Sequence, residues 1–151
     1  MAKAKAQKTA PKHKSFNARS IAGQFSFRFS GFTMDANDTP FHLTGIGWFS
    51  LDGQGNLTGA QTSSTTQIAR QGGVHKYSQY TLNGTYAVNA NGTGTAIIDF
   101  TTKTPGSVPM QGYFDLMMAG SNRFWFMSTK EILSDGSAAD EVVSGEAVKT
   151  S

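Results

Sequence analysis

The stretch QFSFRFSGF, residues 24–32, alternates aromatic and polar side chains with a period of two. In an extended chain its first three phenylalanines lie on one face and the intervening polar residues on the other. This alternation predicts a β-strand that buries one face and exposes the other to water. Phe32 departs from the alternation directly after Gly31, which predicts a β-bulge at this point.

Seven further segments are rich in Thr, Phe, Tyr and Val, residues that favour the pleated surface of a sheet. No segment carries a ten-residue helical period, although residues 128–141 have room for one helical turn. The sequence therefore predicts an all-β fold of eight strands. The further strands are expected at residues 42–51, 57–67, 77–88, 93–102, 110–119, 123–130 and 141–149.

Glycine and asparagine punctuate the chain between these segments, as in LDGQGN at residues 51–56. A calcium loop of the EF-hand type would need Gly at its sixth and Glu at its twelfth position, where this chain has Leu57 and Ser63. Glycine-rich phosphate loops would need a Lys-Ser ending or a third glycine leading into a helix. The punctuation instead predicts tight turns between antiparallel strands, because Asp-Gly and Asn-Gly tolerate positive φ.

The connections between the expected strands alternate in length along the chain. In an antiparallel meander, successive connections fall at opposite ends of the sheet. Eight strands are enough to close into a barrel, so we expect an up-and-down antiparallel barrel. The long connections should lie at one end, which is open, and the tight turns and both termini at the other end, which is closed. The long connections are residues 34–41, 68–76, 103–109 and 131–140, and the tight ones are residues 52–56, 89–92 and 120–122.

The expected barrel, residues 22–149, resembles the calycin-type barrels, that is, the lipocalin-like group and the small bacterial barrel proteins related to it. Gly23, Gln24 and Phe25 are similar to the Gly-x-Trp motif that begins the first lipocalin strand, with Phe in place of Trp. The cysteine pair that is usual in lipocalins is absent. The resemblance implies that a small apolar molecule is captured at the open end of the barrel.

The first 20 residues form a separate segment. Six of the 13 Lys and Arg residues lie there, whereas none of the 10 Asp and Glu residues precedes Asp35. A segment without apolar periodicity cannot bury enough surface to offset the entropy of ordering it, so we expect residues 1–20 to be a disordered basic tail and residues 21–151 the barrel domain. The tail is either a solubilising leader or a binding arm for nucleic acid or another anionic surface.

Targeting signals give little information on compartment. No apolar run reaches the length of roughly 18 residues that a membrane helix needs, and no apolar stretch of the kind found in a signal peptide follows the basic start. The chain contains no cysteine, so neither disulfides nor thiol chemistry report the redox environment. The sequence is compatible with a cytoplasmic protein or with one secreted after processing.

Motifs for chemistry are scarce. The chain has neither a Gly-x-Ser-x-Gly elbow nor a spacing of histidines typical of a zinc site, so we expect no metal and no cofactor. We favour a non-enzymatic binding protein over an enzyme. The candidate ligand contacts are aromatic residues on the inward faces of the strands and histidines in or beside the long loops: Phe27, Phe29, Phe49, Tyr86, Phe114, Phe124 and Phe126, with His42 and His75.

Two alternatives remain open from the residues alone. The same aromatic side chains can fill the interior and leave no cavity. A cavity with a buried carboxylate can instead support chemistry of the cyclase or isomerase type, for which Asp99 and Asp115, each set among apolar residues, are the candidates.

The segment RFWFM, residues 123–127, is apolar on both faces. One face of a barrel strand points outward, so Trp125, like Trp48, needs a second cover. Burial of one large aromatic side chain contributes on the order of 2–3 kcal/mol. We therefore expect a homodimer that buries the face carrying Trp48 and Trp125.

Overall fold

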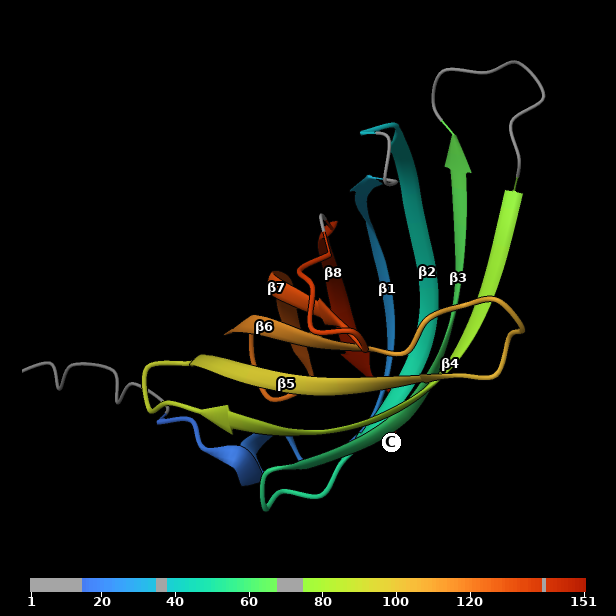
Figure 1. Cartoon of the computed structure of the whole chain (residues 1–151). Helices are drawn as coiled ribbons and strands as arrows, with labels where there is room; N and C mark the ends of the chain where they lie inside the picture. The colour runs from blue at the N-terminus through green and yellow to red at the C-terminus, as the bar shows by residue number, and fades with distance from the viewer. Residues whose placement is uncertain (1–14, 35–37, 68–74, 140) are drawn as a thin grey trace, which may run out of the picture.

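The computed structural model describes residues 15–34, 38–67, 75–139 and 141–151 (Figure 1). They form eight antiparallel strands that close into a barrel, as predicted. No helix among these residues is long and apolar enough to cross a membrane. The strands are β1 (Gly23–Met34), β2 (Pro40–Leu51), β3 (Asn56–Gln67), β4 (His75–Val88), β5 (Thr93–Thr102), β6 (Met110–Met118), β7 (Arg123–Leu133) and β8 (Glu141–Lys149).

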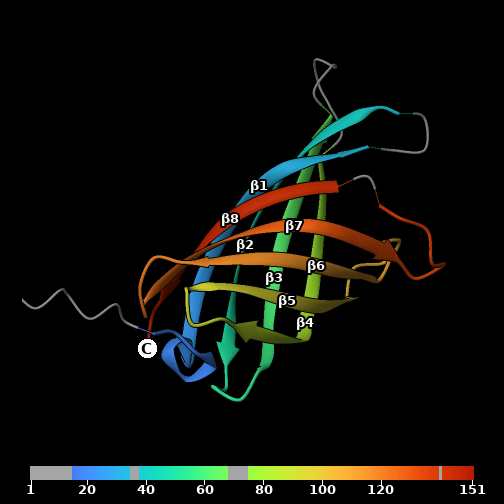
Figure 2. The same cartoon turned by 90° about the vertical axis from the view of Figure 1, so that its left-hand side faces the viewer.

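Each strand pairs with its neighbours in the chain, and β1 pairs with β8 to close the ring. The four long connections therefore join strands at one end of the barrel, and the three tight turns lie at the other (Figures 1 and 2). At the long-loop end, hereafter the open end, Lys103 N donates to Gln79 O and Ser134 N donates to Pro109 O, each across about 3 Å. The connections of the open end thus contact one another and neighbouring strands.

The opposite end is closed by residues that precede the first strand. Asn17 caps a 3-10 helix, η1 (Ala18–Ile21), whose Ile21 is fully buried. Figure 2 shows η1 and the carboxyl terminus beside the tight turns. We expected disorder through residue 20, but residues 15–20 are ordered because Phe16 and Ala18 pack against the barrel core. Residues 1–14 of the expected tail lie outside the described residues.

The predicted bulge in β1 is absent. The strand keeps an unbroken register with β2 and β8, so Gly31 takes the inward position and Phe32 points outward, beside the ring of His42. The reason is spatial: a Cβ on Gly31 would overlap the carbonyl oxygen of Val142 on β8. The glycine allows the backbones of β1 and β8 to approach closely.

A bulge occurs instead in β7. The register against β6 shifts between Tyr113 and Phe114, which pair with Lys130 and Ser128, so that Thr129 is the extra residue. The strand then continues to Leu133, three residues beyond the predicted end. The one helical turn considered for residues 128–141 does not form among the described residues of this segment, 128–139 and 141. A tight turn within the sequence SDGS joins Leu133 to Ser137 instead.

Strands β7 and β8 pair over only part of their lengths. The ladder ends at Met127 and Ser144, while β8 goes on pairing with β1 as far as Glu141. At the divergence, the Ser128 hydroxyl accepts a hydrogen bond from Val143 N at 2.9 Å and donates one to Val143 O at 3.4 Å. The two strands therefore separate toward the open end.

Candidate functional site

The barrel encloses a cavity of about 510 Å³. Aromatic rings stack along its wall: the centroids of Phe27 on β1 and Phe49 on the neighbouring β2 are 4.7 Å apart, and those of Phe49 and Phe124 on the more distant β7 are 5.9 Å apart. The interior is therefore a cavity and not a filled core. It is lined by all seven of the aromatic residues predicted from the sequence, namely Phe27, Phe29, Phe49, Tyr86, Phe114, Phe124 and Phe126.

The two predicted histidines are placed differently. His42 lies in β2 with its side chain exposed on the outer face, 5.7 Å from the ring of Phe32, and does not line the cavity. Its neighbour Leu43 is buried inward, so strand alternation directs His42 outward. His75 is the first residue of β4, and its side chain lies outside the described part of the chain.

Tyr86 lies where the cavity meets the closed end of the barrel. Its hydroxyl accepts a hydrogen bond from Gly53 N at 3.0 Å and donates one to Ala18 O at 3.3 Å. These two bonds join the β2–β3 turn and η1 to β4. Burial raises the pKa of the Tyr86 hydroxyl, which keeps this donor neutral.

Tyr86→Phe is expected to lower the free energy of unfolding by about 1–2 kcal/mol, because Gly53 N, a buried donor, loses its acceptor. Urea denaturation monitored by tryptophan fluorescence measures this change. Thr85→Ser, on the exposed face of the same strand, is the control and should change stability little. An unfolding midpoint equal to that of the wild type would show that the closed end does not depend on this hydroxyl.

One wall of the cavity is polar. Ser63 and Ser78 face each other across β3 and β4 and are both buried, and the Ser78 hydroxyl lies 2.9 Å from that of Ser107 in the β5–β6 loop. Tyr80 follows on β4, and burial raises the pKa of its hydroxyl. Lys76 completes this wall at the open end, where its ammonium group donates to Gly106 O.

Two carboxyl groups line the same cavity near the open end. Glu131 from β7 is 2% exposed, and Glu141 from β8 forms a side-chain hydrogen bond with it. Burial raises the pKa of Glu131 to about 9, with a further contribution from the charge of Glu141, and burial also raises the pKa of Glu141 to about 7. Between about pH 7 and pH 9 the pair therefore shares one proton, which resides on Glu131.

Glu131 was missed in the sequence because the bulge at Thr129 shifts the alternation of inward and outward side chains in β7. Counting by twos from Phe124 places Lys130 inward, but Thr129 and Lys130 are both exposed, and Glu131 takes the next inward position. Glu141 could have been found, since it shares the inward parity of Val143 in β8. The separation of β7 from β8 leaves room for both carboxyl groups.

The carboxylates that we singled out from the sequence lie elsewhere. Asp99 is exposed and accepts a hydrogen bond from Gln111 Nε2 at 2.7 Å. Asp115 is also exposed, on the outer face of β6. Neither side chain faces the cavity, because each alternates with buried neighbours that point inward. Among the described residues, no three His, Cys, Asp or Glu side chains gather as metal ligands would.

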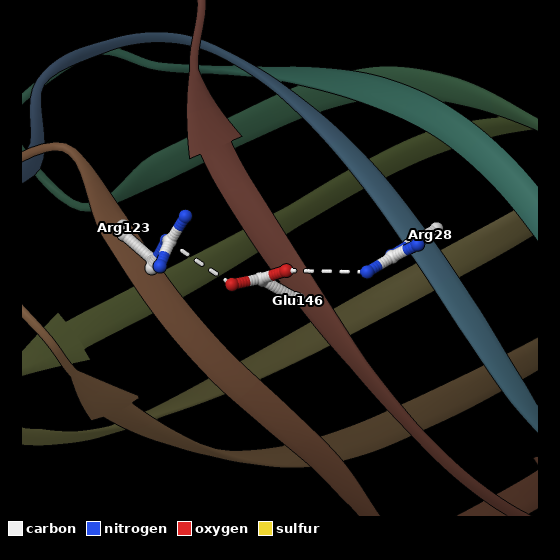
Figure 3. A network of polar contacts seen from close by, with 3 residues as sticks. All are labelled: Arg28, Arg123 and Glu146. Carbon is white, nitrogen blue, oxygen red and sulfur yellow. Dashed lines mark ion pairs between the residues drawn. The ribbon is translucent and has the colours of Figure 1, made fainter.

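The outer face of the barrel carries an ion-pair network (Figure 3). Glu146 of β8 lies 3.1 Å from Arg123 of β7 and 3.8 Å from Arg28 of β1. Trp125 pairs with Glu146 in the ladder and is 49% exposed, while Trp48, on β2, is 43% exposed. Both tryptophans thus lie on the outer surface and neither contributes to the cavity.

Comparison with known proteins finds similarity to two solved structures. No family model and no curated protein sequence matches the chain. A crystal structure of Rv2717c from M. tuberculosis is similar, with 12% sequence identity and a TM-score of 0.41 over 87% of this chain and 94% of that chain. The S-type phycobiliprotein lyase CPES from Guillardia theta is similar at 5% identity, with a TM-score of 0.37 over 89% of this chain and 90% of the lyase.

Proposed function

We propose that the protein is a non-enzymatic binding protein that holds a small apolar molecule inside the barrel. The observation that carries this proposal is the 510 Å³ cavity, whose volume falls in the range of roughly 300–1,000 Å³ typical of small-molecule sites. Its apolar lining runs from Leu51 and Leu57 near the closed end to Met34 and Phe41 at the open end. Met34 is exposed, so the cavity reaches the surface where a ligand enters.

A cavity-filling substitution tests the proposal. Ser63→Phe places a ring against the polar wall, where the neighbouring Ser78 leaves space, and is expected to weaken binding of the apolar fluorophore N-phenyl-1-naphthylamine about tenfold or more. Fluorescence titration measures the dissociation constant. Thr62→Phe adds the same ring to the exposed face of β3 and should bind the fluorophore like the wild type. Absence of binding to the wild type, or equal binding by Ser63→Phe, would contradict the proposal.

A second candidate is chemistry of the cyclase or isomerase type. It loses Asp99 and Asp115 as candidate groups, but the protonated Glu131 supplies a buried acid at the cavity wall. Chromatography of a bound ligand, recovered after incubation with the wild type and with Glu131→Gln, separates the two functions. A binding protein returns the ligand unchanged, whereas an enzyme returns a converted molecule from the wild-type incubation alone.

Two further partners remain predictions. A homodimer would cover Trp48 and Trp125 on the outer face, and sedimentation of the wild type against Trp125→Ser tests it. Binding of nucleic acid or another anionic surface would depend on the basic tail, of which residues 1–14 lie outside the described residues. Deletion of residues 1–14 should then abolish a salt-dependent affinity.

A further inference from the structure

Glu131 has an oxygen atom without a partner among the described residues. Its Oε2 is buried and makes no hydrogen bond with them, although Glu131 lines the cavity and is only 2% exposed. A buried polar atom left unpaired costs free energy, typically about 1–3 kcal/mol. Because Glu131 lines the cavity together with Glu141, a ligand group that enters between the two carboxyl groups can complete this hydrogen bonding.

The pair needs a donor and not another acceptor. With the shared proton between Glu131 and Glu141, the remaining oxygens of both carboxyl groups can only accept hydrogen bonds. A hydroxyl donates once, while an ammonium group donates three times and also carries the charge that opposes the negative charge of the pair. A carboxylate ligand would instead add a second negative charge beside it.

None of the charged groups described around Glu131 and Glu141 acts as the hydrogen-bond donor that the pair needs. Of the described residues that line the cavity, Lys76 is the one cation, and its ammonium donates to Gly106 O. Tyr80 also faces the cavity, and the charges of Glu131 and Glu141 contribute to the raised pKa of its hydroxyl. The ion pairs of the described residues involve Glu146 and neither of the two cavity glutamates.

We propose that the ligand is an amphiphilic amine whose ammonium group binds between Glu131 and Glu141 while its apolar part fills the barrel. This inference rests on the proposed binding function and names the class of its ligand. When the ammonium binds, both carboxyl groups become ionised and the proton they shared is released to solvent. The aromatic wall of Phe27, Phe49 and Phe124 receives the hydrocarbon.

The test compares decylamine, decanol and decanoate in displacing N-phenyl-1-naphthylamine from the full-length wild type at pH 7.5. Decylamine should displace the fluorophore at a concentration about tenfold or more below that of either of the others, because it alone carries an ammonium group. Glu131→Gln and Glu141→Gln should each bring the ratio of amine to alcohol affinity close to one. Asp99→Asn, which alters an exposed carboxylate on the outer face, should leave the ratio unchanged.

A second measurement uses the wild type alone. Calorimetric titration with decylamine in buffers of different ionisation enthalpy should show release of up to one proton per amine bound, and none with decanol. Equal affinity for decylamine and decanol, tighter binding of decanoate, or no proton release would overturn the amine assignment and leave the apolar cavity supported. Failure of all three compounds and of the fluorophore to bind would overturn the proposed function itself.

Discussion

Glu131→Gln is expected to abolish most of the loss of stability that the wild-type protein undergoes as the pH rises from 7 to 9. Burial raises the pKa of Glu131 from its ordinary value of 4.5 to about 9. Between these values the folded protein holds a proton that the unfolded chain has released, so the free energy of unfolding falls as the pH rises. One such proton gives a slope of about 1.4 kcal/mol per pH unit. Between pH 7 and pH 9 the loss therefore amounts to about 2–3 kcal/mol.

Glu141 adds to the slope in the lower part of this window. Burial raises its pKa from 4.5 to about 7, so its contribution is complete below pH 4.5 and is lost as the pH rises to about 7. Above pH 7 the remaining slope belongs to Glu131. The comparison of the wild type with Glu131→Gln is therefore sharpest between pH 7 and pH 9.

Urea denaturation at each pH unit from 5 to 9 measures both curves. Asp99→Asn removes an exposed carboxylate and is the matched control, with a pH dependence like that of the wild type. The Gln side chain has the size of Glu and can still donate to Glu141, so the variant is expected to fold. If its stability fell with pH as steeply as that of the wild type, Glu131 would not be the group that holds the proton.

The architecture could be predicted because two regular signals agree. Alternation in segments such as residues 24–30 identified strands and their buried faces, and the lengths of the connections identified the up-and-down order. Side-chain alternation fixes direction wherever a strand keeps its register, so the seven aromatic residues were placed correctly in the cavity wall. The same rule, applied to His42, would have directed it outward.

Glu131 could not be predicted from alternation. One extra residue at Thr129 reverses the parity of everything that follows in β7, and the sequence carries no mark of that bulge. The close approach of β1 and β8 is equally invisible, since it arises from closure of the ring. In the sequence, a glycine at position 31 is equally compatible with a bulge and with a close approach of two backbones, and the structure shows the close approach.

Gly31→Ala is accordingly expected to destabilise the barrel by about 3 kcal/mol. A methyl group at this position would overlap the carbonyl oxygen and carbon of Val142 and the Cα of Val143, all of them backbone atoms. These atoms belong to the β1–β8 ladder and cannot rotate away as a side chain can, so relief requires opening of the strand pair that closes the barrel. Equilibrium urea denaturation measures the loss.

Two other substitutions distinguish the cost of the overlap with the β8 backbone from the general cost of a substitution in this sheet. Ser30→Ala changes the adjacent, exposed position and should alter stability by less than about 0.5 kcal/mol. At Gly112 the nearest atoms to an added methyl are ring atoms of Phe114 and Phe100, which line the cavity and have space to move into. Gly112→Ala should therefore cost less than Gly31→Ala. Equal costs at the two glycines would mean that the β1–β8 closure yields as readily as a ring at the cavity wall.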